Sequence, residues 1–195
     1  MTNDHQSMAR LALALYENGS GPREVLRECY GVGFPEEFFV VSEAMPQLMF
    51  HYTILPWALA RGGPPRTAGP LDSLERRVLD RDPDLIPLGL CLGDDDGTGP
   101  DLDGEFLCYR RSELAAGRST LVSVAFEANP EDPITARGSS LLAALHEHHV
   151  ANATWTEQER RRTAGHSGGS VFDDEDVVAA RECVADIEEL RRRVR

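Results

Sequence analysis

The chain has 195 residues, of which 41% are hydrophobic and 27% are charged, and its formal net charge is −13. This composition is typical of a soluble, folded protein of one domain and excludes a disordered or low-complexity chain. The acidic balance argues against binding to nucleic acid or to anionic membranes, because both require clustered lysine and arginine. A basic protein would be attracted to such a surface, although many proteins are acidic for solubility alone.

The four cysteines, Cys29, Cys91, Cys108 and Cys183, are far apart in the sequence and form no C-x-x-C pair. This spacing argues against a zinc ribbon or a dense disulfide scaffold, and we expect reduced cysteines packed in the core. No signal peptide is evident, and the longest apolar stretch, residues 45–60, is interrupted by prolines and polar residues. We therefore expect a cytoplasmic protein that needs no cofactor.

Periodic apolar residues predict several helices in the first 81 residues. Pro22 lies in the first turn of one of them, and Gly31 follows its last turn. A proline and two acidic residues open another, because acidic side chains favour a helix N-terminus. The predicted helices cover residues 7–17, 22–30, a run that begins at 35, part of 45–60, and 71–81.

The pattern then changes to short apolar runs at residues 85–92, 105–110 and 119–128, which predict three antiparallel strands. The first two runs flank an acidic segment and would form a hairpin with a long loop. Helices precede and follow these strands in the sequence. This order predicts an α+β fold, with a small antiparallel β-sheet packed with several helices.

Two helix starts are predicted after the strands. Ser139 or Ser140 would cap a helix over residues 141–150. A capping box from Thr156 to Glu159 marks a second start.

We expect residues 1–160 to form one domain, residues 161–172 a flexible Gly/Ser linker, and residues 173–195 a C-terminal helix. Acidic residues begin this amphipathic helix and arginines end it, as the helix dipole favours. Val177 and Ile187 fall near one apolar stripe. Because such a stripe must be covered, the helix either docks on the domain or binds a partner, and self-association is one option.

The segment GDDDGTGPDLDGE, residues 93–105, contains six acidic residues and no basic one. Counted as a calcium loop of the EF-hand type, it places Asp94, Asp96, Thr98 and Glu105 at positions 1, 3, 5 and 12. Thr98 is an unusual residue at position 5, and strands rather than helices are predicted on both sides. Three interpretations of the loop therefore stay open: it binds calcium, it binds a basic protein, or it is simply solvated.

The segment is not expected to be catalytic, because acidic side chains in a wet, Gly-rich loop keep ordinary pKa values. If it binds a basic protein, its acidic side chains are the candidate contacts. These are Asp94, Asp95, Asp96, Asp101, Asp103 and Glu105.

Two further motifs suggest chemistry that we do not expect. His146 and His149 in HEHH have a spacing that gives half of a metal site, but no third ligand is evident, and we interpret them as the exposed face and end of a helix. GHSGG (165–169) matches a serine nucleophile motif centred on Ser167. A charged helix rather than a buried strand is predicted before it, and no histidine follows His166.

Three segments, residues 30–43, 84–111 and 120–148, together resemble the SUKH superfamily. The resemblance includes FPEE (34–37) at the start of an early helix and LIPLG (85–89) in a strand. It continues with a Gly/Asp-rich loop, with the strand FLCY (106–109), and with Ser140-Leu141 at the start of a helix. The chain differs from the family in the length of residues 44–83 and in its extra C-terminal helix. It also lacks the tryptophan that the family has near the middle, for which Trp57 is a substitute candidate.

The SUKH superfamily includes bacterial immunity proteins and fungal cell-wall-assembly regulators. The resemblance implies an α+β fold and a binding function rather than an enzymatic one. It also implies a toxin as partner, and many such toxins are nucleases. A nuclease must be basic to hold its substrate, which agrees with the acidic charge of this chain.

Overall fold

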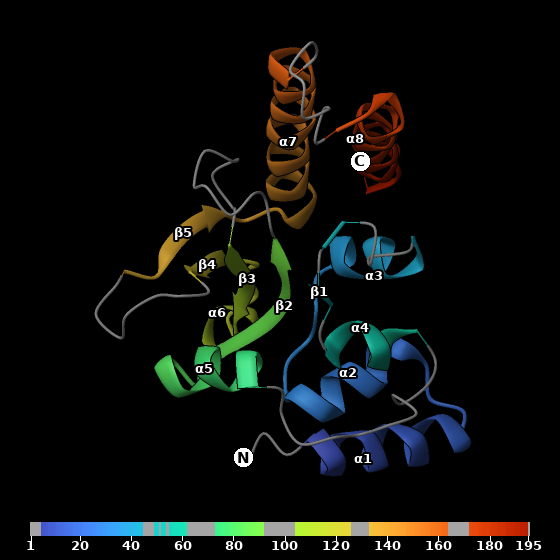
Figure 1. Cartoon of the computed structure of the whole chain (residues 1–195). Coiled ribbons are helices and arrows are strands. Elements are labelled where there is room, and N and C mark those ends of the chain that lie inside the picture. The colour runs from blue at the N-terminus through green and yellow to red at the C-terminus, as the bar shows by residue number, and fades with distance from the viewer. Residues whose placement is uncertain are drawn as a thin grey trace.

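The computed structural model describes residues 5–44, 49–50, 52–53, 55–61, 73–91, 104–125, 133–163 and 172–194. These residues form eight helices and one five-stranded antiparallel sheet, which confirms the predicted α+β class (Figure 1). The helices are α1 (His5–Glu17), α2 (Pro22–Tyr30), α3 (Glu36–Glu43), α4 (Leu55–Ala60), α5 (Ser73–Arg81), α6 (Arg111–Ala115), α7 (Leu141–Thr163) and α8 (Asp174–Val194). The strands are β1 (Tyr52–Thr53), β2 (Leu85–Cys91), β3 (Glu105–Arg110), β4 (Leu121–Ala125) and β5 (Thr135–Gly138).

The strands lie in the order β1-β2-β3-β4-β5, and each is antiparallel to its neighbours. The three central strands are the three predicted from the sequence. The two edge strands were not predicted, because they are too short to show an alternating pattern. β1 has two residues and β5 has four, three of them exposed.

A β-bulge in β2 explains how a strand with a proline can lie inside the sheet. Pro87 pairs with Cys108 and Gly89 with Leu107, so that Leu88 is an extra residue in β2. The carbonyl oxygen of Leu88 accepts a hydrogen bond of 2.6 Å from the indole nitrogen of Trp57. The bulge thereby fixes α4, which carries Trp57, against the sheet.

The sheet is buried on both faces. The larger core lies between one face and the helices α1 to α4, α7 and α8, and the ring of Trp57 stacks on Phe38 within it. On the other face, Val78 of α5 packs with Phe106 and Cys108. None of the four cysteines forms a disulfide, and Cys29, Cys91 and Cys108 are buried, as the sequence predicts.

The N-terminus of α7 is held by a carboxylate from α3. Ser140 accepts a hydrogen bond of 3.1 Å from the backbone N–H of Ala143, and it is therefore the cap that the sequence left open between two serines. The Ser140 hydroxyl donates to Glu37, which also accepts the backbone N–H of Leu142 at 3.2 Å. A negative charge at this position compensates the helix dipole.

α7 is one continuous helix of 23 residues, and the predicted second helix start at Thr156 is wrong. Thr156 is buried in the middle of α7, and its hydroxyl donates to the carbonyl of Asn152, four residues earlier, at 2.8 Å. This bond replaces the capping interaction that the motif suggested. The first three residues of the predicted linker, 161–163, belong to α7.

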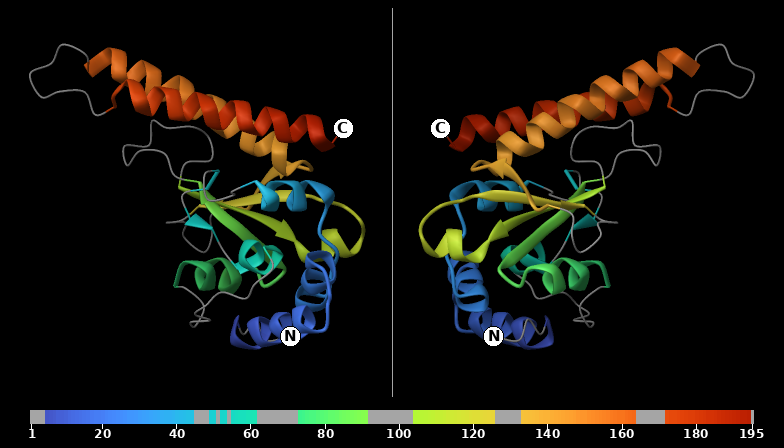
Figure 2. Two further views of the ribbon diagram at one scale, coloured as in Figure 1. Left: turned by 90° about the vertical axis from the view of Figure 1, so that its right-hand side faces the viewer. Right: turned by 90° about the vertical axis from the view of Figure 1, so that its left-hand side faces the viewer.

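α7 and α8 lie side by side as a helical arm that extends beyond the rest of the molecule (Figure 2). Its root, residues 141–149 and 183–194, packs on the body of the protein, where Ile187 and Leu190 of α8 join the larger core. Its tip, residues 150–163 and 172–182, lies at the other end. Docking on α7 and α3 accounts for the apolar stripe of α8, because Val177 and Ile187 are both buried.

Candidate protein-binding surface

One end of the sheet brings together three strand ends that border acidic segments. Cys91 at the end of β2 is paired with Glu105 at the start of β3, and Glu105 is paired with Ala125 at the end of β4. The strand flanks predicted for the acidic segment are therefore confirmed. Residues 92–104 connect the first two positions, and residues 126–132 follow the third.

Both segments are rich in carboxylates. Residues 92–104 contain five acidic residues and residues 126–132 contain three, and neither segment contains a lysine, arginine or histidine. Of the residues predicted to contact a partner or calcium, Glu105 is described, and the others lie outside the described residues. These others are Asp94, Asp95, Asp96, Thr98, Asp101 and Asp103.

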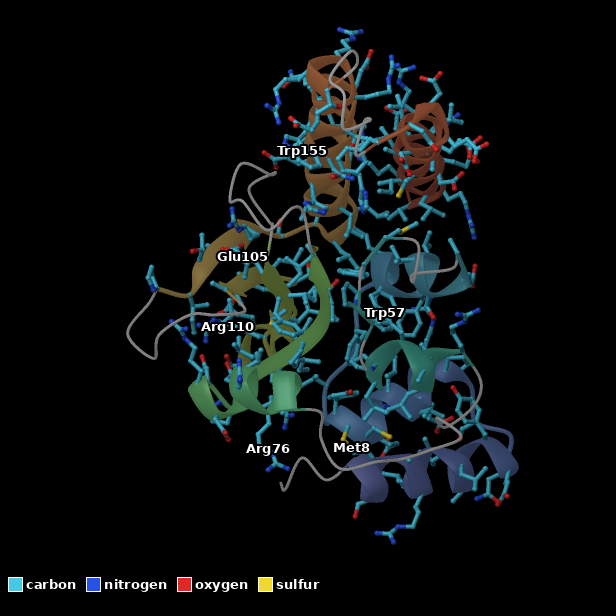
Figure 3. All side chains as sticks on the ribbon, viewed as in Figure 1. Met8, Trp57, Arg76, Glu105, Arg110 and Trp155 are labelled. Carbon is cyan, nitrogen blue, oxygen red and sulfur yellow. The ribbon has the colours of Figure 1, made fainter. Side chains whose placement is uncertain are left out.

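Glu105 is held by an arginine from the edge strand, and it lies on the sheet as labelled in Figure 3. Its carboxylate accepts from Nη2 of Arg137 at 2.5 Å, and Nε of Arg137 donates to the hydroxyl of Ser123 at 2.7 Å. Glu105 and Arg137 are mostly shielded from solvent, with side chains 18% and 22% exposed. A calcium ion that used Glu105 as its last ligand would have to displace this arginine.

The opposite end of the same hairpin has acidic side chains that are already neutralised. Arg110, also labelled in Figure 3, lies 2.7 Å from a carboxylate oxygen of Asp82 and 3.9 Å from one of Asp84. Asp84 further accepts the backbone N–H of Ser112 at 2.9 Å. These carboxylates fix the turn before β2 and the start of α6. We call the end of the sheet with Cys91, Glu105 and Ala125 the acidic end, because the two acidic segments adjoin it in the sequence.

A second acidic surface lies along the outer face of α8. Glu175, Glu182, Asp186 and Glu189 are exposed and fall at helical spacing on one stripe. Among the described residues, Glu189 has an ion pair of 3.2 Å with Arg192, whereas no ion pair is recorded for the other three. This stripe is a solvated charged face, and it offers a matched comparison for the acidic end of the sheet.

The histidines of HEHH differ from the prediction that they form an exposed helix end. His146 is half-buried and lies 3.4 Å from Glu188 of α8. His148 and His149 are buried, with 5% and 9% of their surfaces exposed, and Cys183 of α8 lies against the ring of His149. Within the described part of the chain, no group of three His, Cys, Asp or Glu side chains could hold a metal ion.

The serine motif falls outside the described residues, which end at Thr163 and resume at Phe172. The charged helix expected before Ser167 is present, since α7 runs to Thr163 and carries three arginines in its last turn. A nucleophile elbow requires a buried strand at this position. The helix therefore agrees with the interpretation of GHSGG as a chance match.

Comparison with protein-family models, with curated proteins and with solved structures finds no match for this chain. The resemblance to the SUKH superfamily thus rests on the sequence motifs given above. No helix in the described ranges is both long and apolar enough to cross a membrane.

Proposed function

We propose that this chain is a non-enzymatic protein-binding module, and specifically an immunity protein that neutralises a basic toxin domain, such as a nuclease, by direct binding. The observation that carries the proposal is the pairing of Cys91, Glu105 and Ala125 at one end of the sheet. In this register, residues 92–104 and 126–132 adjoin the ends of neighbouring strands. Together these two segments contain eight acidic residues and no basic one.

Electrostatics explains why such an arrangement would suit a basic partner. Opposite charges accelerate encounter and fix the orientation of the two proteins, and like charges reject wrong partners. A nuclease surface that holds phosphates carries clustered lysine and arginine. An acidic protein that covers this surface would block the substrate without any chemistry of its own.

The motifs shared with the SUKH superfamily support the same function. Two of them, LIPLG and FLCY, lie in β2 and β3, the hairpin that bears the acidic end. A cytoplasmic location belongs to the same proposal, and four cysteines without a disulfide agree with it. Self-association through α8 stays a prediction, which light scattering over the micromolar range would test.

The experiment is capture of partners from a lysate of the native host on the immobilised protein, at about 50 mM and about 500 mM NaCl. A loop variant carries Asp94→Asn, Asp95→Asn, Asp96→Asn and Asp101→Asn. A control variant with the same change in charge carries Glu175→Gln, Glu182→Gln, Asp186→Asn and Glu189→Gln on α8.

We expect the wild type and the α8 variant to capture one basic protein at low salt and the loop variant to lose it. Because exposed charges are screened by salt, capture by the wild type should weaken at high salt. Equal capture by all three proteins would remove the acidic end of the sheet from the proposal. Capture of no basic protein by the wild type would contradict the proposed function itself.

A further inference from the structure

Two consecutive histidines lie buried at the root of the arm, and the proposed binding function does not use them. The ring centroids of His148 and His149 are 5.0 Å apart, with their planes at 74°. His149 connects three parts of the chain, because it lies on α7 and contacts Met49 through one ring nitrogen and Cys183 of α8 through the other. We call these two residues the histidine pair.

The contacts of His149 define which of its nitrogens carries the hydrogen. Nε2 lies 2.9 Å from the carbonyl oxygen of Met49, which can accept but not donate. Nε2 therefore donates to this carbonyl, and Nδ1 is left as an acceptor. Nδ1 lies 3.5 Å from Sγ of Cys183, whose thiol can donate to it. A second proton on the ring would take the place of the thiol hydrogen and leave a cationic N–H that faces the sulfur, which is only a weak acceptor.

His148 is poorly placed to carry a charge. Within the described residues, its Nδ1 is buried and has no hydrogen-bond partner. Burial, and then the neighbouring His149, lower the pKa of His148 to about 4. Burial also lowers the pKa of His149, although its bond to Met49 acts in the opposite direction. A proton on His149 places a positive charge in the interface between α7 and α8, and a proton on His148 places one at a buried ring whose Nδ1 has no partner among the described residues.

The charged groups around the pair do not compensate such a charge. From α8, Asp186 acts on the pKa of Cys183, and Glu188 contacts the half-buried ring of His146. From α3, Glu43 is paired with Arg193 at 2.9 Å. From the segment before β1, the contact is the neutral carbonyl of Met49. No carboxylate among the described residues is recorded in contact with either buried ring.

We propose that the histidine pair is an acid-sensitive latch that holds the root of α8 and the Met49–Phe50 segment on α7 and releases them when it is protonated. The release affects the root before the tip. Glu157 at the tip has its pKa lowered, chiefly by its hydrogen bond from Arg181, so its ion pair persists in mild acid. The latch goes beyond the proposed binding function and does not depend on it.

The test measures the reactivity of Cys183, whose thiol the closed latch covers. The purified full chain is treated with 4,4′-dithiodipyridine, a thiol reagent that works in mild acid, at pH values from 7.5 to 5. Each rate is divided by that of a short cysteine peptide at the same pH. Cys183→Ala identifies the signal, since the other three cysteines are buried in the core.

We expect the ratio to rise roughly tenfold from pH 7.5 to 5, because proton uptake by a suppressed histidine shifts the opening equilibrium by up to tenfold per pH unit. The double variant His148→Gln, His149→Gln should lose this rise, and His146→Gln, which changes the half-buried neighbour that contacts Glu188 of α8, should keep it. A flat ratio in the wild type, or a rise that persists in the double variant, would overturn the latch. If the double variant does not fold, His148→Gln alone is measured instead, and a rise that persists in it would equally overturn the latch.

Hydrogen exchange then separates a latch from general unfolding. After correction for the intrinsic effect of pH, amides of residues 183–194 should exchange faster at pH 5 than at pH 7.5, while those of α2 should not change. Equal acceleration in α2 and in residues 183–194 would show that acid opens the whole domain and would contradict the proposal.

Discussion

The root and the tip of the arm belong to the same two helices but are stabilised by different forces. The root is apolar, with Leu145 and Ile187 fully buried in the larger core. The tip is held by surface ion pairs, such as those between Glu157 and Arg181 at 2.7 Å and between Arg160 and Asp174 at 2.9 Å.

The aromatic contact of the tip is between Trp155, labelled in Figure 3, and Phe172, and both rings are partly exposed. Burial of apolar surface resists salt, whereas exposed ion pairs are screened by it. The difference teaches that a helical hairpin can be docked firmly at one end and only loosely closed at the other. Substitutions, pH and salt should therefore act on the two halves separately.

The largest effect is expected from removing an apolar side chain at the root. Ile187→Ala leaves a cavity in the larger core and should lower the free energy of unfolding by about 3 kcal/mol. The matched control is Val178→Ala at the tip, where the side chain is 51% exposed and a change below about 0.5 kcal/mol is expected. Urea denaturation measures both. Similar losses in the two variants would mean that α8 is not part of the core.

Acid should be the next largest perturbation of the root. The pKa of His148, about 4, is below its ordinary value of 6.5, so the unfolded chain takes up a proton in this interval that the folded chain does not. Stability is thus complete above pH 6.5 and is lost as the pH falls, by about 2 kcal/mol at pH 4.5. His148→Gln should show a correspondingly smaller loss in urea denaturation between pH 7.5 and 4.5. An identical pH dependence in the variant would show that other groups cause it.

The contact between Glu37 and the N-terminus of α7 should contribute less to the free energy of unfolding. Glu37→Gln removes the negative charge at the N-terminus of α7 but keeps an acceptor for Ser140, and it should cost about 1 kcal/mol. Glu36→Gln is a suitable control, because Glu36 pairs with Arg23 at an exposed site. Thermal unfolding should show a clearly larger decrease in Tm for Glu37→Gln. Equal decreases would mean that the charge on Glu37 does not stabilise α7.

Local patterns predicted the parts of the fold that depend on neighbouring residues. α2 begins and ends as expected, with Pro22 in the first turn and Gly31 in the left-handed conformation, φ 73°, after the last. β2 and β3 follow from their apolar patterns. The sequence pattern did not predict that α7 is continuous, because Thr156 and Glu159 fit a helix start as well as a helix interior. Tertiary packing, which a local motif does not encode, decided between the two.

The candidate surface was predictable in composition but not in arrangement. The acidic segment and its hairpin follow from the sequence, whereas the adjacency of residues 126–132 depends on the register of β3 with β4. The ion pair of Glu105 with Arg137 required an edge strand that has no clear pattern. Similarly, His148 and His149 are polar in the sequence, and the burial of His149 depends on tertiary contacts with Met49 and with Cys183 of α8.

The smallest effect is expected at the tip, and salt should reveal it. Arg181→Gln removes the contact with Glu157, which has a second ion-pair partner in Arg161 and lies in an exposed site. Global stability should hardly change, but amides of residues 174–182 should exchange a few-fold faster at low salt. Since salt screens exposed charges, this difference from the wild type should disappear at about 1 M NaCl. A difference that survives high salt would mean that Arg181 contributes packing rather than charge, and the tip would then resemble the root.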